Sequence, residues 1–176
     1  MRNFLAAFLL LCFFSASGQT VLINGEKTTR PIRWDDFTGT PDQSTNLFAY
    51  TYWNIRYNWD AFTYKGDTAQ LKVNVIVELG KNSWKKSDKV TDSLLDHERG
   101  HFYIGWLCAI AFQKRVNAAV LLRQNYESVI AGIFNEELEK YRQMELLYDN
   151  ETNHFYNRVQ QRKWDLYFEK ELQPYR

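Results

Sequence analysis

The sequence predicts an α+β fold in which a small antiparallel sheet is followed by a buried helix and two further helices. Two observations predict it. Residues 69–79 alternate between apolar and polar side chains, as a strand with one wet face does. After residue 87, apolar residues instead recur at helical spacing over long stretches. The 176 residues suffice for one domain with a substantial core.

Residues 1–18 have the pattern of a signal peptide. Arg2 supplies a positive start, residues 4–14 form an unbroken apolar run, and small residues precede a cleavage point before Gln19. The apolar run is about half of the ~20 residues that a spanning helix needs, so we expect cleavage and no transmembrane anchor. The mature chain, residues 19–176, is then a single domain exported to the periplasm or the extracellular space.

The strands are predicted in the first half. Residues 32–34 predict a short strand before a turn-rich loop, and residues 47–59 are aromatic, alternating and β-prone. Residues 65–67 (Lys-Gly-Asp) offer a turn between this segment and the strand at 69–79. We expect two or three antiparallel strands, with 69–79 as the exposed edge to which an extended substrate adds.

The second half predicts three helices. Ser87 or Asp88 could cap the first, which runs to about Lys114. Apolar residues are expected on nearly every side of this helix, so it should be central and buried. The other two helices are expected at about 123–147 and 157–171.

The first helix carries the pattern His97-Glu98-Arg99-Gly100-His101. Residues four apart lie on one face of a helix, so the two imidazoles can bind one metal ion. Glu98 can then reach a water on that ion without being a ligand, which is the arrangement that zinc peptidases use with the glutamate as general base. The competing interpretation is a buried helix with two hydrogen-bonded core histidines.

A catalytic zinc ion needs a third protein ligand. The chain has three histidines, so the one left is His154, which we expect on a loop after the second helix. Asp149 could be the third ligand instead, although we expect it to accept the free ring N–H of a ligand histidine. Glu127 or Glu136, both on the second helix, would give a site of two histidines and a glutamate.

Two further roles are assigned from the sequence. Tyr148, Tyr156 and Arg158 are candidates for donating a hydrogen bond to the oxyanion of the transition state. Cys108 is the one cysteine left after signal-peptide cleavage, and its apolar neighbours predict a buried structural thiol.

These residues favour a zinc-dependent metallopeptidase acting on peptide or protein substrates. The 22 basic residues against 21 acidic ones argue against a nucleic-acid partner. A second possibility is a zinc amidase acting on cell-wall peptides. A third is a peptide- or glycan-binding module with an inactive metal site. The alternating aromatic residues at 50–59 could form a surface that binds peptides or glycans. Packing in the hydrophobic core explains these aromatic residues as well.

Three stretches resemble a bacterial domain-of-unknown-function family whose members are regarded as secreted zinc-dependent proteases. They are Trp34 to Asp42 (WDDFTGTPD), Leu95 to Phe102 (LDHERGHF) and Tyr148 to His154 (YDNETNH). The resemblance implies a zincin-like α+β fold and adds weight to His154 and Asp149 as site residues. Two positions depart from the expected pattern: Arg99 is charged where zincins in general have an uncharged residue, and Phe155 stands where the family is expected to have glycine.

Overall fold

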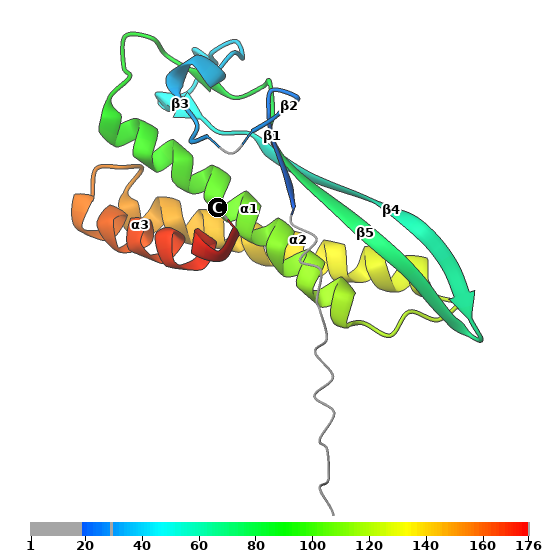
Figure 1. Cartoon of the computed structure of the whole chain (residues 1–176). Helices are drawn as coiled ribbons and strands as arrows, with labels where there is room; N and C mark the ends of the chain where they lie inside the picture. The colour runs from blue at the N-terminus through cyan, green and yellow to red at the C-terminus, as the bar shows by residue number, and fades with distance from the viewer. Residues whose placement is uncertain (1–18, 29, 176) are drawn as a thin grey trace, which may run out of the picture.

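The computed structural model describes residues 19–28 and 30–175, so the predicted signal peptide lies outside the described residues. Along the chain, the strands come first and the three α-helices follow (Figure 1). The strands are β1 (Thr20–Ile23), β2 (Glu26–Lys27), β3 (Ala49–Tyr50), β4 (Trp53–Lys65), β5 (Thr68–Leu79) and β6 (Trp84–Lys85). The helices are α1 (Asp92–Ala118), α2 (Tyr126–Thr152) and α3 (Arg158–Leu172), with 3₁₀ turns at Trp34–Asp36 and Gln173–Tyr175. The predicted α+β class is confirmed.

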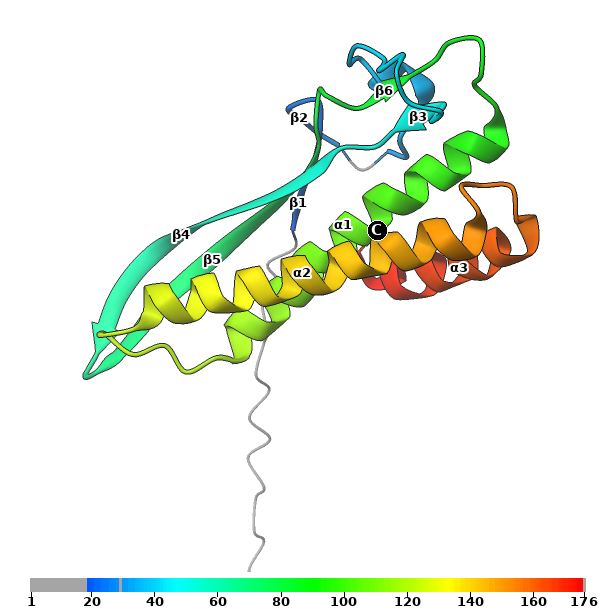
Figure 2. The same ribbon diagram turned by 180° about the vertical axis from the view of Figure 1, so that it is seen from behind.

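The main sheet has the strand order β2-β1-β5-β4. β4 and β5 form a long antiparallel hairpin, which reaches over the first half of α2 and the last half of α1 (Figures 1 and 2). β1 joins β5 in parallel, a pairing that the sequence did not reveal. The prediction that 69–79 is the sheet edge beside the active helix is wrong, because β5 lies between β4 and β1.

The strand predicted at residues 32–34 is also wrong. Residues 34–36 form a 3₁₀ turn, and the buried Asp36 carboxylate accepts hydrogen bonds from the Arg33 main-chain N–H at 2.7 Å and from the Arg30 guanidinium at 2.6 and 2.7 Å. A side chain that binds the main chain three residues back stabilises a turn rather than an extended strand.

α1 is the central helix, as predicted. Its N-cap is Thr91, three or four residues after the predicted caps, because Thr91 accepts a hydrogen bond from Leu94 N–H. The inward residues of β5 lie on one side of α1, and α2 and α3 pack on the other (Figure 2). Cys108 is buried among these contacts, with 1 % exposed, which confirms the prediction of a buried thiol.

α2 runs to Thr152, five residues beyond the predicted end, and Asn153 closes it in a left-handed conformation with φ 46°. Tyr148 and Asp149 therefore lie in the last turns of a helix, and a short turn connects them to α3. Within the described part of the chain, no helix has the length and apolar character needed to cross a membrane.

Candidate metal centre

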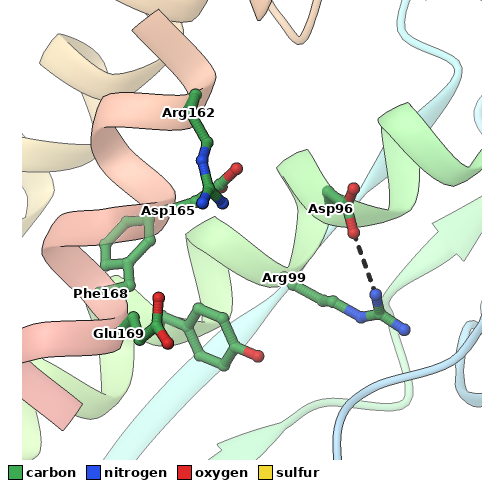
Figure 3. Close-up of a pocket in the computed structure, with 7 residues that line it drawn as sticks. Asp96, Arg99, Arg162, Asp165, Phe168 and Glu169 are labelled. Atoms are coloured by element: carbon green, nitrogen blue, oxygen red, sulfur yellow. Dashed lines mark hydrogen bonds and ion pairs between the residues drawn. The ribbon is translucent and has the colours of Figure 1, made fainter. Parts of the chain in front are cut away.

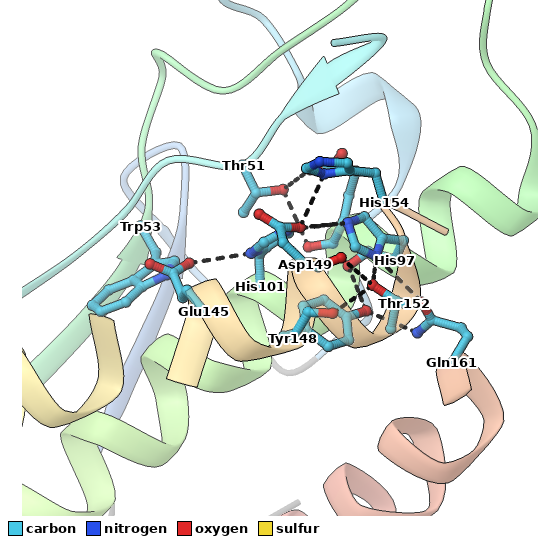
Figure 4. Close-up of polar contacts among 11 residues, drawn as sticks. Thr51, Trp53, His97, His101, Glu145, Tyr148, Asp149, Thr152, His154 and Gln161 are labelled. Carbon is cyan, nitrogen blue, oxygen red and sulfur yellow. Dashed lines mark hydrogen bonds and ion pairs between the residues drawn. The ribbon is translucent and has the colours of Figure 1, made fainter. Parts of the chain in front are cut away.

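Three potential metal ligands meet between α1 and α2 (Figure 4). His97 and His101 project from one face of α1, as their spacing predicts. Asp149 reaches them from the last turn of α2. Its Oδ1 lies 3.1 Å from His97 Nε2 and 3.1 Å from His101 Nε2, and the two Nε2 atoms are 3.2 Å apart. The three atoms thus form a nearly equilateral triangle.

This triangle matches the spacing of ligands around a zinc ion. Zinc bonds of about 2.0–2.1 Å in a tetrahedron place neighbouring ligand atoms about 3.3–3.4 Å apart. Hydrogen bonds explain the triangle less well. Each Nε2 can carry one proton and the carboxylate carries none, so protons can bridge at most two of the three contacts. A single cation shared by the three atoms satisfies all of them.

The far nitrogen of each histidine is held by an acceptor. His101 Nδ1 lies 3.2 Å from Glu145 Oε1, which also accepts a 2.7 Å hydrogen bond from Trp53 Nε1. His97 Nδ1 lies 3.2 Å from Gln161 Oε1. With the Nδ1 protons directed to these acceptors, each Nε2 can bind a metal ion once the proton facing Asp149 is displaced. The sequence carried no local pattern that could have identified Glu145, Trp53 or Gln161.

The electrostatics of the cluster favour positive charge. Burial alone lowers the pKa of His101, but the Asp149 and Glu145 carboxylates outweigh it and raise that pKa to about 10. Burial likewise raises the pKa of Asp149, yet the hydrogen bonds from His101 and His97 hold it well below its usual range. Both shifts mean that the cluster favours a positive charge beside the Asp149 carboxylate.

Glu98 is adjacent to the cluster but is not among its potential ligands. It is buried, and Thr51 Oγ1 lies 2.6 Å from its Oε2 and 3.1 Å from its main-chain oxygen. Thr51 belongs to the segment between β3 and β4, so this contact ties the sheet to the motif helix. Sequence reasoning missed Thr51 as well.

Tyr148 lies behind the cluster rather than in it. Its ring stacks on the His97 ring at 4.7 Å, and its hydroxyl donates a 3.0 Å hydrogen bond to the His97 main-chain oxygen. The side chain is fully buried, with 0 % exposed, and Gly100 leaves the space that it fills. Its hydroxyl is committed to the protein, so Tyr148 orients His97 and does not face a substrate.

His154 lies at the outer side of the cluster. Its Nδ1 is 3.4 Å from Asp149 Oδ1, but its side chain is 54 % exposed, against 3 % for His97, and it is not part of the ligand triangle. It sits in the turn after α2, where Asn153, His154 and Phe155 all have positive φ angles. The φ of 81° at Phe155 explains why glycine would suit that position. In this geometry Asp149, and not His154, completes the triangle with the two histidines of α1.

The remaining predicted site residues lie elsewhere. Tyr156 is 61 % exposed and stacks on Phe155, and Arg158 donates to the Ser93 main-chain oxygen. Glu136 forms an ion pair with Arg115, and Glu127 accepts a hydrogen bond from the adjacent tyrosine at the start of α2. The Arg99 guanidinium pairs with Asp96 and Ile32 O, away from the histidines.

Residues 26–155 match a protein family described as "Bacterial protein of unknown function (DUF922)". The match covers about three quarters of the 176 residues, so the chain belongs to this family, which confirms the resemblance seen in its three motifs. No curated protein and no solved structure matches the chain. α3 lies beyond the matched segment.

Proposed function

We propose that this protein is an exported zinc-dependent metallopeptidase with a zincin-like active site. The observation that carries the proposal is the ligand triangle of His97, His101 and Asp149, with Glu98 beside it on α1. Three protein ligands leave a position open for water, as catalytic zinc sites do and structural sites do not. When bound, zinc lowers the pKa of that water and polarises the scissile carbonyl.

The chain's own groups supply the proton transfers. Glu98 accepts the proton of the attacking water and delivers it to the leaving amine. Thr51 holds one carboxylate oxygen of Glu98, at 2.6 Å, and we assign the other carboxylate oxygen to the water. His154 is exposed beside Asp149, where its imidazole can donate to the developing oxyanion. We therefore assign His154 to the transition state and Asp149 to the metal.

The main chain beside Glu98 offers a place for an extended substrate. Phe48 O and Tyr52 O accept hydrogen bonds from Lys86 N–H and Gly80 N–H. Alternate residues of a strand direct their main-chain groups to opposite edges, so those of Ala49 and Thr51 face away from β6. A peptide adding to this edge would lie next to Glu98, after displacing the groups that leave Ala49 and Thr51 only 4 % and 6 % exposed. This segment replaces 69–79 as the proposed substrate edge.

The second candidate function is a peptide- or glycan-binding module, and it is supported by Tyr50 and Tyr52. They are 46 % and 39 % exposed on the same segment, whereas Tyr57 and Trp59 pack against the core. Exposed aromatic rings next to a polar site also bind peptides or glycans without cleaving them.

The test compares the zinc-loaded wild type with the zinc-loaded Glu98→Gln variant on unfolded casein and on cell-wall peptide fragments. We expect casein cleavage by the wild type and a loss of about 10²–10⁴-fold in Glu98→Gln with zinc retained. Glu137→Gln is the matched control, because Glu137 is equally buried but pairs with Arg115 on α1. Full activity in Glu98→Gln would exclude it as the base. Cleavage of cell-wall fragments alone would favour the amidase, and zinc binding with no cleavage would favour the binding module.

A further inference from the structure

α3 contacts His97 Nδ1, the ring nitrogen that faces away from the ligand triangle. This helix lies outside the segment that matches the family. Gln161 is fully buried, with 0 % exposed, and its Oε1 lies 3.2 Å from His97 Nδ1. An amide side chain can face a ring nitrogen with either its oxygen or its NH₂ group. Which group faces His97 decides whether Nδ1 can carry a proton, because the amide oxygen accepts a hydrogen bond and the NH₂ group donates one.

The neighbours of Gln161 determine its orientation. Its Nε2 lies 2.9 Å from Asp165 Oδ1, and a carboxylate can only accept. The same Nε2 lies 2.8 Å from Tyr148 Oη, whose own proton goes to His97 O. Both amide hydrogens are therefore used, and the oxygen is left to face His97. Thr152 Oγ1 is a second, weaker acceptor, 3.4 Å from His97 Nδ1. It can only accept there, because its own proton is donated to Tyr148 O.

We propose that Gln161, oriented by Asp165, is a positioning residue that keeps the His97 proton on Nδ1 and its electron pair on Nε2, toward the ligand triangle. Asp165 lines a pocket between α1 and α3 together with Arg162 and Asp96 (Figure 3). The contacts from Asp165 through Gln161 to His97 therefore lead from this pocket to the metal centre. α3 is thus part of the centre and not only its support. The proposal rests on the proposed metal site but not on peptidase activity.

The first test measures the His97 tautomer by NMR in ¹⁵N-histidine-labelled, metal-free Asp149→Ala protein at alkaline pH, because the Asp149 carboxylate, 3.1 Å from Nε2, would otherwise compete for the proton. We expect the proton on Nδ1 in Asp149→Ala and a mixture of tautomers when Gln161→Met is added to it. A proton on Nε2 in Asp149→Ala would overturn the proposal. This readout does not depend on zinc, so it decides the proposal even if the protein binds no metal and the proposed function fails.

The second test measures zinc affinity by competition with a chelating dye. We expect Gln161→Met to weaken binding about tenfold, the lower end for residues that hold a ligand histidine, because Thr152 remains as an acceptor. Gln113→Met is the matched control: Gln113 is a buried glutamine whose Nε2 donates to Asn117 on the same helix. An equal loss of zinc affinity in both variants would show a general folding effect and contradict the proposal.

Asp165→Ala keeps the Gln161 side chain but removes the carboxylate that orients its amide. Asp165 is only half-buried, so this variant should fold even if Gln161→Met does not. We expect a smaller loss of zinc affinity than in Gln161→Met and a mixture of His97 tautomers. In the Gln161→Met background, Asp165→Ala should change neither quantity, because it acts through the amide. Independent, additive effects would show that Asp165 does not act through Gln161.

Discussion

Gly100→Ala is expected to destabilise the protein and disturb the metal centre through Tyr148. A Cβ at this position would lie 2.1 Å from Tyr148 Oη, 2.5 Å from Cζ and 3.0 Å from Cε1. Ordinary contacts need about 3.4 Å or more, so the ring must retreat by over 1 Å. The side chain is fully buried, so this movement breaks its hydrogen bonds to His97 O and Gln161.

The size of the effect follows from these contacts. Overpacking costs about 1–3 kcal/mol, and the two lost hydrogen bonds about 1 kcal/mol each. The better helix propensity of alanine offsets about 1 kcal/mol. We therefore expect the free energy of unfolding to fall by about 2–4 kcal/mol, measured by urea unfolding of metal-free protein. Zinc affinity should also fall, because Tyr148 stacks on His97.

Gly132→Ala is the matched control for this prediction. Gly132 is also a helical glycine, but a Cβ there meets nothing within 4 Å. The same substitution should stabilise α2 by up to about 1 kcal/mol. The reasoning would be refuted if Gly100→Ala unfolded at the same or a higher urea concentration than the wild type.

Three further predictions concern charge, metal removal and the thiol. Below its raised pKa of about 10, His101 holds a proton that zinc must displace. Zinc binding near pH 7 should thus release about one proton, seen by calorimetry in buffers of different ionisation enthalpy, and zinc affinity should rise about tenfold per pH unit. When free zinc is at about 1,000 times its Kd, removing it with a chelator should lower the free energy of unfolding by about 4 kcal/mol. The melting temperature in a thermal scan should then fall by about 8–16 °C. Burial raises the pKa of Cys108 to about 12, so Ellman's reagent at pH 8 should detect this thiol only in urea.

Local patterns predicted the parts of the site that depend on one helix. The four-residue spacing of His97 and His101 fixes their common face whatever the rest of the chain does, so this pair and Glu98 could be read from the sequence. Alternation likewise predicted the β5 strand, because one of its faces packs on α1 and the other meets solvent.

Contacts between distant segments could not be predicted in this way. Asp149 and His154 are five residues apart, and the packing of α2 on α1 places Asp149 against the histidines, while His154 lies in the left-handed turn after α2. Glu145 and Gln161 look like ordinary charged and polar helix residues until the helices are packed. The parallel pairing of β1 with β5 is equally non-local, which is why the sheet edge was placed wrongly.

Zinc content measured by elemental analysis on purified residues 19–176 tests the central claim most directly, with wild type, Asp149→Ala and His154→Ala side by side. We predict one zinc per chain in the wild type and in His154→Ala, and its loss or marked weakening in Asp149→Ala. Zinc retained in Asp149→Ala but lost in His154→Ala would make His154 the third ligand. No zinc in the wild type, even after reconstitution, would contradict the metal centre altogether.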